Sequence, residues 1–511
     1  MSQATETSSD PGFGQALRRG TFWSTLDTVL GRGGQFVLGV FIARILAPQD
    51  FGVFAVALVV HAIVLSVGEM GVSAALIRDV EDTRARTAPT VATIALACAA
   101  TLGAVMAASS GALASLLGSP DAAGPIAVMA INLPLLGLGA VPAALLRRDF
   151  RLDRVFVADT ANLVLTAVTV IILAKAGWGP MALAWSWVIG QTATTVVLYT
   201  YRPGRFWPGW NRHEARRLLA FGIPLAGANI VAYSVLNVDY VIVGRVLGAT
   251  MLGFYVLAFN ISGWPMNVFG SVVRSVSLPG FSRLQRHGES MPDRFADGLR
   301  LVASISLPVC FVLAALARPL VVTVYGSRWS LAASALVGLS ALGGARILIE
   351  LTGDFLITLG RTKQVFYAQL PWLAGLVVAL LVGVHTHGIV GAAAAQAIVS
   401  VGLMTPLYFL FTVRAGVPTR LIVGALTSPL LWAALAGAAA FVVSRALPDP
   451  LMALLAGGTA GFVVFLVANR RALTELARAR RTAASTSSVN GGDGGDGVDA
   501  GLALEGVGGA R

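Results

Sequence analysis

Two arginines lie where a membrane span would bury them, and their chemistry is that of anion binding. Arg32 is near the middle of the apolar stretch 22–46, and Arg346 is near the middle of the stretch 331–359. A cation at the centre of a span costs about 2.5–3.5 kcal/mol on insertion scales, so it rarely faces lipid. We therefore expect both guanidinium groups to line a polar cavity and to bind an anionic substrate. Arg274 is a third substrate-binding candidate, although its position nearer a span end is equally typical of a snorkelling side chain.

Carboxylates in the same segments are candidates for binding a coupling ion. Glu350 and Asp354 follow Arg346 at i+4 and i+8, which stacks the three side chains on one helix face. The pattern predicts either a static ion pair or an exchange site, in which a cation competes for the carboxylate while substrate competes for the arginine. Asp27 and Asp239, which also lie within apolar segments, are the other ion-coupling candidates.

Motifs for covalent chemistry or nucleotide hydrolysis are absent from the sequence. The phosphate-binding pattern G-x-x-x-x-G-K-[ST] does not occur, and neither does H-E-x-x-H or a paired-cysteine metal spacing. Cys98 and Cys310 both lie in apolar segments and predict no disulfide framework. We expect a protein that is not an enzyme and has no cofactor, metal site or catalytic residue. His61 lies inside the second span, where a hydrogen-bonded core histidine is favoured over a proton relay.

Membrane-spanning helices must position these residues. Hydrophobic residues make up 56% of the 511 residues, charged residues make up 12%, and the mean hydropathy is +0.77. Soluble domains carry about 25% charge. The apolar runs are continuous and close to the roughly 20 residues that a helical span needs, which is not the alternation of barrel strands. We predict an all-α integral membrane protein with about fourteen transmembrane helices, at residues 22–46, 51–76, 88–110, 123–146, 155–175, 180–201, 218–246, 252–277, 298–318, 331–359, 364–384, 388–413, 421–444 and 450–469.

Lysine and arginine residues alternate between rich and poor loops along these spans. With the N-terminus inside, the cytoplasmic segments hold 26 of them, and the opposite side holds six, namely Arg44, Lys175, Arg245, Arg318, Arg328 and Arg445. This is the positive-inside pattern, and it accounts for the net charge of +12 without a nucleic-acid partner. Both termini are therefore predicted to be cytoplasmic. Basic residues near the membrane also predict contact with anionic membrane lipids.

The chain repeats itself at an offset of 201 residues. ARILAPQDFGVFAVAL aligns with GRVLGATMLGFYVLAF, which pairs Arg44 with Arg245 and Gly52 with Gly253. The offset covers six spans, an even number, so it predicts two parallel six-helix lobes related by a pseudo-two-fold axis along the membrane normal, with a cavity between them. The predicted organisation is a cytoplasmic N-tail (1–14), an N-lobe (15–214), a C-lobe (215–415), two extra C-terminal helices (416–469) and a disordered cytoplasmic tail (470–511).

The order of several motifs resembles the polysaccharide transport family of the multidrug/oligosaccharidyl-lipid/polysaccharide flippase superfamily. These motifs are the repeated segment, GEMGVSAALIRD, RRDFRLDRVF, LPGFSRLQ, LVVTVYGSRWSLAA and LITLGRTKQ, and the likeness covers about residues 15–415. It implies a multi-pass flippase of the bacterial inner membrane that moves undecaprenyl-pyrophosphate-linked oligosaccharide (for O-antigen, capsule or exopolysaccharide) to the periplasmic leaflet by alternating access. It further implies a cationic central cavity, with a polysaccharide polymerase and a chain-length regulator as partners.

Three other interpretations remain open at this point. A cation-coupled drug antiporter of the same superfamily would favour a carboxylate-lined cavity, whereas arginines hold the two most central positions here. A membrane glycosyltransferase or polymerase usually needs a large external loop or a paired-carboxylate site, and the predicted external loops are short. A structural lipid-binding protein without transport is compatible with the same sequence.

Overall fold

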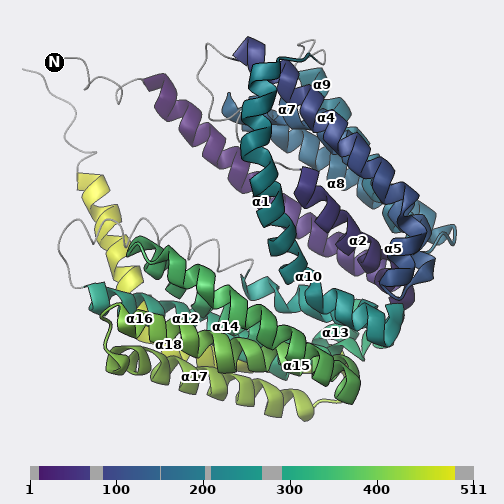
Figure 1. Cartoon of the computed structure of the whole chain (residues 1–511). Coiled ribbons are helices and arrows are strands. Elements are labelled where there is room, and N and C mark those ends of the chain that lie inside the picture. Colours follow the sequence, from purple (N-terminus) through teal and green to yellow (C-terminus); the bar gives the residue numbers. More distant parts are fainter. Residues whose placement is uncertain (1–10, 69–83, 150, 202–208, 267–290, 490–511) are drawn as a thin grey trace, which may run out of the picture.

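The computed structural model describes residues 11–68, 84–149, 151–201, 209–266 and 291–489, and every regular element in these ranges is a helix. The helices form two groups (Figure 1). The first group, the N-lobe, consists of α1 (Pro11–Ile45), α2 (Pro48–Gly68), α4 (Arg84–Ala108), α5 (Ser110–Leu116), α6 (Ala123–Ala130), α7 (Asn132–Arg148), α8 (Leu152–Lys175) and α9 (Pro180–Tyr201).

The second group contains the C-lobe and the two extra helices. The C-lobe consists of α10 (Arg212–Ser262), α12 (Met291–Ala315), α13 (Ala317–Tyr325), α14 (Ala332–Thr358), α15 (Thr362–Ala397) and α16 (Thr405–Arg414), and α17 (Thr419–Arg445) and α18 (Pro450–Val489) follow. α17 packs along α12 and α18 packs along α17, so the extra pair extends the C-lobe side of the molecule (Figure 1).

The predicted span number agrees with the helices once two internal breaks are taken into account. Twelve described segments are long and apolar enough to cross a membrane. α10 is divided at Gly248, where φ is +82°, and α15 is divided at His387–Gly388, where Gly388 has φ +57°. Glycine tolerates positive φ without the steric penalty that a Cβ brings. The break in α10 falls between the predicted spans 218–246 and 252–277. The break in α15 falls between the predicted span 364–384 and the next one, which continues through Ile398–Met404 and α16 to Arg414. Counting each divided segment as two spans gives the fourteen predicted from the sequence.

α10 links the two lobes physically as well as in sequence. Ala215 and Leu218, in its first turns, share an apolar cluster with Val91 of α4 and Leu145 of α7. The predicted lobe boundary after residue 214 therefore falls inside a helix whose first half leans on the N-lobe. From Asp239 onward α10 also contacts the C-lobe, through Gln396 of α15 and Gly343 of α14.

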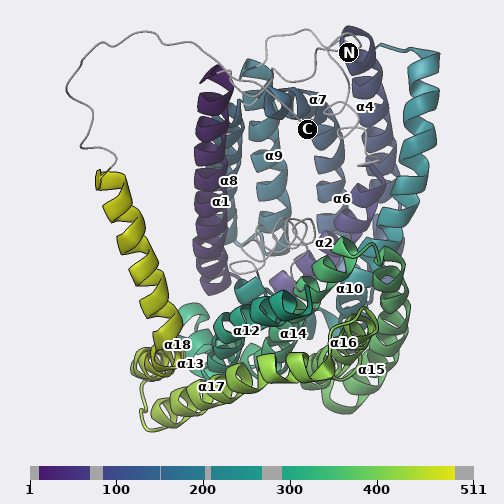
Figure 2. The ribbon, with the colours of Figure 1, turned by 90° about the vertical axis from the view of Figure 1, so that its left-hand side faces the viewer.

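The predicted tails need correction. Residues 470–489 were expected to be disordered, but α18 continues to Val489, past the end of its candidate span at Arg470. The segment RALTELARARRTAA is rich in alanine, arginine and leucine, which are among the strongest helix formers. The extension projects away from the other helices in Figure 2. At the other end, α1 begins at Pro11, inside the predicted N-tail. The remainder of each predicted tail lies outside the described residues.

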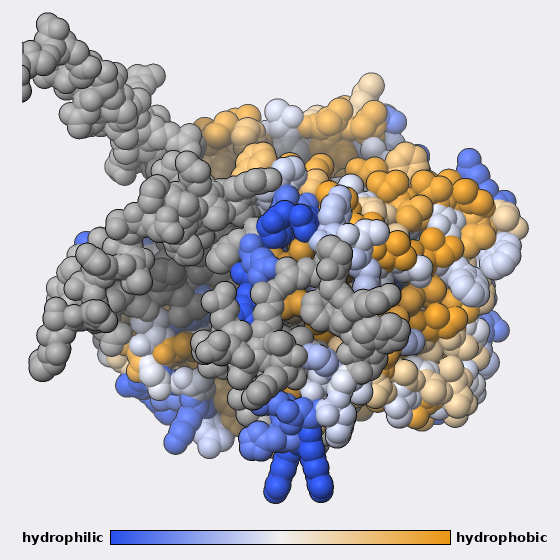
Figure 3. Space-filling model, turned by 90° about the horizontal axis from the view of Figure 1, so that it is seen from above, coloured by the Kyte–Doolittle hydropathy of each residue, from blue (hydrophilic) through white to orange (hydrophobic). Residues whose placement is uncertain are grey.

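Large apolar side chains face outward along the helices, as a lipid environment requires. Leu431 and Val442 of α17 are each 66% exposed, and Phe462 of α18 is 58% exposed. Viewed from above, hydrophobic areas occupy much of the described surface and hydrophilic residues gather between them (Figure 3). Exposed apolar surface of this extent marks a membrane-embedded protein.

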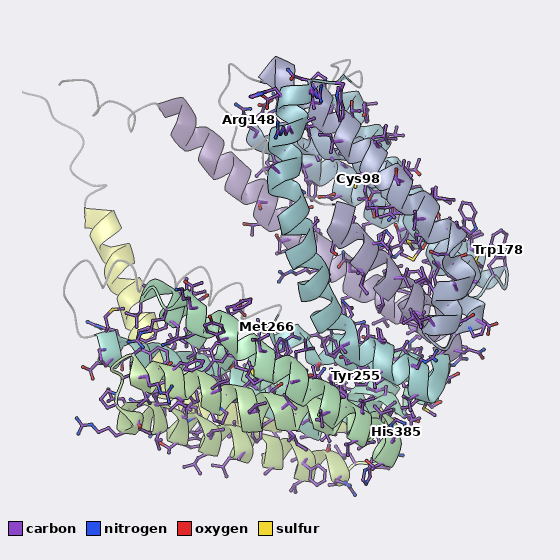
Figure 4. All side chains as sticks on the ribbon, viewed as in Figure 1. Cys98, Arg148, Trp178, Tyr255, Met266 and His385 are labelled. Atoms are coloured by element: carbon purple, nitrogen blue, oxygen red, sulfur yellow. The ribbon has the colours of Figure 1, made fainter. Side chains whose placement is uncertain are left out.

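The lobes meet at one end, which we call the junction and define as residues 43–54, 115–118, 244–254 and 323–329. There α2 packs against α10, and α1 contacts α13. From the junction the two groups of helices diverge (Figures 1 and 2). Trp178 lies at the junction end of the N-lobe, and Arg148 lies at its opposite end (Figure 4).

Candidate functional site

Asp239 on α10 is the centre of a buried polar cluster in the C-lobe. Its side chain is only 1% exposed. The Tyr255 hydroxyl and the Gln396 amide each donate a hydrogen bond of 3.0 Å to Asp239 Oδ2, and the backbone N–H of Tyr240 donates one of 2.9 Å to Oδ1. These donors come from both halves of α10 and from α15. Among the described residues Asp239 has no ion-pair partner, so its carboxylate is satisfied by neutral donors alone.

Arg346 lies beside this cluster. Its guanidinium carbon is 5.9 Å from the centroid of the Phe259 ring, and Phe259 in turn packs on Tyr240 at 5.5 Å between centroids. α14 approaches α10 closely just before Arg346, because a Cβ on Gly343 would lie 2.8 Å from the Ser262 carbonyl oxygen. The structure thus brings two sequence candidates, Asp239 and Arg346, to one patch of aromatic rings.

Glu350 and Asp354 continue along α14 from Arg346. Asp354 is 8% exposed, and Glu350 is half-buried. Both side chains are engaged in interactions, so neither is a free carboxylate. Arg274, the third arginine candidate, lies outside the described residues.

Arg32 belongs to the exposed face of α1 that points towards the C-lobe. Phe36, four residues later and therefore on the same helix face, packs edge-on against Trp264 at 5.0 Å between ring centroids. Trp264 is only five residues beyond Phe259, the ring that Arg346 covers. Arg32 is exposed and engaged with other residues. The face of α1 that carries Arg32 therefore meets the C-lobe at Trp264, close in the sequence to the Phe259 ring that Arg346 covers.

A second charged cluster lies in the N-lobe, around Asp27. The charge of Arg147 on α7 acts on Asp27 of α1 and on Asp159 of α8, and the charge of Asp27 acts on Asp159. Packing of Trp23 on Phe156, at 5.2 Å between ring centroids, holds α1 against α8 next to this cluster. Asp159 is half-buried and was missed in the sequence analysis. Its place inside the predicted span 155–175 is the signal that would have revealed it.

His61 fulfils the expectation of a core histidine. It is 3% exposed, and its Nε2 lies 3.4 Å from Nδ2 of Asn132 on α7. No group of three or more potential metal ligands occurs in the part of the chain that the structure describes.

The junction holds a reciprocal pair of arginine contacts that the sequence analysis did not predict. Arg44 donates hydrogen bonds to the carbonyl oxygens of Thr323 (2.6 Å) and Val324 (2.9 Å), at the end of α13 in the C-lobe. Arg245 donates to the carbonyl oxygens of Ser115 (3.0 Å) and Leu116, at the end of α5 in the N-lobe. Each guanidinium thereby neutralises the negative end of a helix in the opposite lobe. The repeat had already paired Arg44 with Arg245, and this equivalence was the available signal.

An aromatic residue, Trp329, packs between the two lobes at the junction. Trp329, fully buried, donates a 2.7 Å hydrogen bond from Nε1 to the carbonyl oxygen of Ala43. Its ring packs edge-on against Phe51 of the N-lobe at 5.1 Å and against Phe254 of the C-lobe at 5.8 Å. The part of the junction around Trp329 is therefore buried, tightly packed and hydrogen-bonded.

The sequence of this chain is similar to those of known proteins. The model of the family described as "Polysaccharide biosynthesis protein" matches residues 41–334. The succinoglycan biosynthesis transport protein ExoT of Rhizobium meliloti is 30% identical over 62% of this chain. The lipopolysaccharide biosynthesis protein WzxC of Escherichia coli is 24% identical over 73% of this chain and 76% of its own length. The alignment with ExoT spans 64% of that protein, just under two thirds of its length.

Solved structures share the fold at low sequence identity. The lipid II flippase MurJ in an inward closed conformation matches with a TM-score of 0.70 at 15% identity, over 89% of this chain and 99% of its own. An inward-facing multidrug resistance MATE transporter of the MOP superfamily matches with a TM-score of 0.59 at 14% identity, over 76% of this chain and 96% of its own. These likenesses establish the two-lobe fold.

Proposed function

The chain belongs to the polysaccharide biosynthesis protein family, and we propose that it is a flippase that carries a lipid-linked oligosaccharide across the membrane. The names of its sequence relatives, a succinoglycan transport protein and a lipopolysaccharide biosynthesis protein, support this class of cargo. The proposed reaction breaks no covalent bond, so the protein acts as a transporter and not as an enzyme.

One observation carries the mechanism: the reciprocal arginine contacts join the lobes at one end, while the helices diverge from there. Arg44 and Arg245 bind helix ends of opposite lobes, and each contact is exposed enough to be exchanged for water. Breaking the two contacts together would let the lobes rock about the substrate and open the junction end. This is the geometry that alternating access between repeats requires.

The substrate headgroup in this proposal meets Arg32 and Arg346. A diphosphate is anionic and is excluded from a dry bilayer, and arginine pairs with phosphate oxygens in a fixed two-pronged geometry. The face of α1 that carries Arg32 meets Trp264, and Arg346 covers Phe259, so a headgroup bound there would touch both moving parts. The lipid tail would stay in the bilayer beside the lobes. Arg274 remains a third candidate for the same role.

Ion coupling is the finer part of the proposal. Asp239 is the strongest candidate because it is buried and has neutral donors only, which leaves room for a proton or a cation to compensate its charge. Asp27 with Asp159 forms a second candidate in the N-lobe. Glu350 and Asp354 remain candidates on the face of Arg346. Binding of an ion at Asp239 would rearrange Tyr255 and Gln396, and so would couple both parts of α10 to α15.

Sidedness and partners complete the proposal. The excess of basic residues in alternate loops supports cytoplasmic termini and a junction that faces the periplasm of a bacterial inner membrane. In that setting the cargo is delivered to a polysaccharide polymerase and a chain-length regulator. A cation-coupled drug antiporter is the competing function, and its support is the fold of the MATE transporter alone.

A leaflet-accessibility assay tests the proposal. The purified protein is reconstituted in liposomes with a fluorescent polyprenyl-diphosphate oligosaccharide, and an impermeant reductant bleaches label in the outer leaflet. We expect the protein to make the inner-leaflet label accessible, and we expect Arg346→Gln to slow this by about 10- to 100-fold, the effect of losing a charge-assisted hydrogen bond. Arg420→Gln, an exposed arginine outside both the proposed site and the junction, serves as control. Bleaching that stops at the outer leaflet with the wild type, together with transport of a cationic dye, would favour the antiporter.

A further inference from the structure

A cavity of about 750 Å³ lies where the C-lobe meets the two extra helices, away from the inter-lobe site. Its walls come from the end of α12, from α13 and the turn after it, from the start of α14, and from the end of α17 with the turn into α18. Five alanines line it, and their small side chains leave the space open. The lining residues on which the argument depends are Arg318, Arg445, Ser327, Ser330, Val337 and Phe441.

The charge of this cavity is positive and uncompensated. Arg318 and Arg445 reach it from separate helices, four serine hydroxyls line it, and no aspartate or glutamate does. Among the described residues neither guanidinium has an ion pair or donates a hydrogen bond. Arg445 is held in place by Phe441, with its guanidinium carbon 4.9 Å from the ring centroid. The nearby carboxylate of Asp449 is occupied by the N–H of Met452 and does not line the cavity.

The cavity also sits at the depth of a lipid headgroup. It lies where candidate spans end, at Ala315 and Arg445, and where others begin, at Ala332 and Pro450. Apolar side chains continue from it along the outer surface: Val337 is 52% exposed, and Phe441 of the cavity wall is 46% exposed. A ligand with an anionic head and apolar chains fits this combination, with its head in the cavity and its chains on these side chains.

We propose that this cavity binds the headgroup of an anionic phospholipid from the leaflet on the junction side of the membrane. The Arg318 and Arg445 guanidinium groups bind the phosphate, and the hydroxyls of Ser327 and Ser330 donate to its remaining oxygens. The hydroxyls of Ser334 and Ser444 already donate to backbone carbonyl oxygens. Two arginines that merely snorkelled to the interface would point to separate patches of headgroups, whereas these two share one cavity. The lipid would fasten the two extra helices to α13 and α14, next to the junction. This site is independent of the proposed transport cargo.

Native mass spectrometry of the purified protein tests the site. The probe is phosphatidylglycerol, and the zwitterionic phosphatidylcholine is the reference lipid. We expect preferential retention of phosphatidylglycerol by the wild type and an about tenfold or larger loss of this retention in the Arg318→Gln/Arg445→Gln double variant, because two charge-assisted contacts are removed. The Arg318→Lys/Arg445→Lys variant should keep part of the preference. Arg420→Gln, an exposed arginine at the other end of α17 from Arg445 and outside the cavity, should keep all of it.

Three results would overturn the proposal. The first is equal retention of phosphatidylglycerol by the wild type and by a double glutamine variant whose melting temperature without added lipid is unchanged. The second is displacement of the lipid by millimolar inorganic phosphate, which would make the cavity a site for free anions. The third is retention of polyprenyl phosphate with no retention of phosphatidylglycerol, which would assign the cavity to the carrier lipid.

Discussion

Gly52 of the N-lobe and Gly253 of the C-lobe, which are equivalent in the sequence repeat, pack backbone against backbone at the junction. A Cβ on Gly52 would overlap the carbonyl oxygen of Ala249, and a Cβ on Gly253 would overlap the carbonyl oxygen of Pro48. Each glycine therefore allows its helix to approach the other lobe's backbone directly, as small residues do between membrane helices. The closed junction depends on both.

Replacing either glycine by alanine should open the junction. The added methyl group has only backbone to displace, and overpacking of this kind costs about 1–3 kcal/mol. A cysteine in place of Val56, which is 3% exposed and faces Gly244 of the C-lobe, reports opening through its rate of alkylation in a background without Cys98 and Cys310. Gly52→Ala should accelerate this reaction. Gly39→Ala, whose Cβ would meet no atom within 4 Å, is the matched control, and equal rates in the two variants would contradict the prediction.

Loss of the reciprocal arginine contacts should shift the same equilibrium. We expect Arg44→Gln and Arg245→Gln each to favour the open junction by about 1 kcal/mol, since each removes charge-assisted hydrogen bonds that are partly exposed to solvent. A shift of this size corresponds to a several-fold faster alkylation of the Val56→Cys reporter. Alkylation should be faster in the double variant than in either single variant. The control is Arg420→Gln, an exposed arginine at the start of α17 and outside the junction. A double variant that is no faster than the wild type would show that the contacts do not hold the junction closed.

Replacing the buried carboxylate of Asp239 should abolish the ion dependence of transport without preventing folding. Asp239→Asn keeps the shape of the side chain and can still accept from Tyr255, so the protein should fold while its transport loses dependence on an ion gradient. Tyr255→Phe removes one donor and keeps the charge, and should leave the ion dependence in place. Transport is measured in liposomes with and without an imposed proton or sodium gradient. An Asp239→Asn protein with normal ion dependence would remove Asp239 from the coupling mechanism.

The carboxylates that follow Arg346 allow a test of the alternative coupling site. If Glu350 and Asp354 exchange between Arg346 and a coupling ion, then Glu350→Gln and Asp354→Asn should each lower the transport rate at normal expression. Normal rates in both variants would leave these residues with a structural role in holding α14.

Membrane orientation is open to direct measurement. Reporter fusions after Pro120 and after Gly179 should give external signals, and fusions after Arg86 and Arg212 should give cytoplasmic ones. The expectation follows from the basic residues concentrated in alternate loops. An external signal after Arg212 would reverse the proposed direction of the junction.

The sequence by itself determined the class, the spans and the symmetry of this protein. Composition and continuous apolar runs require membrane helices, and the repeated segment around Gly52 and Gly253 predicts two parallel lobes. Both predictions are possible because hydrophobicity and repetition can be read directly from the sequence. Their positions within predicted spans also identified Arg32, Arg346 and Asp239 as charged residues that are costly to expose to lipid. The helical content of residues 470–489 was readable in principle from propensity, but the Gly/Asp-rich end of the tail outweighed it.

Only the tertiary structure decided which of these residues meet. The repeat pairs Arg44 with Arg245, but only the folded chain directs each of them to the end of a helix in the opposite lobe, 280 and 130 residues away in the sequence. Asp159 joins Asp27 only because Trp23 packs α1 against α8, and Arg318 shares a cavity with Arg445 only because α17 and α18 return to the C-lobe. Such contacts depend on how helices cross, which is set by the packing of many side chains at once and not by the spacing within any one segment.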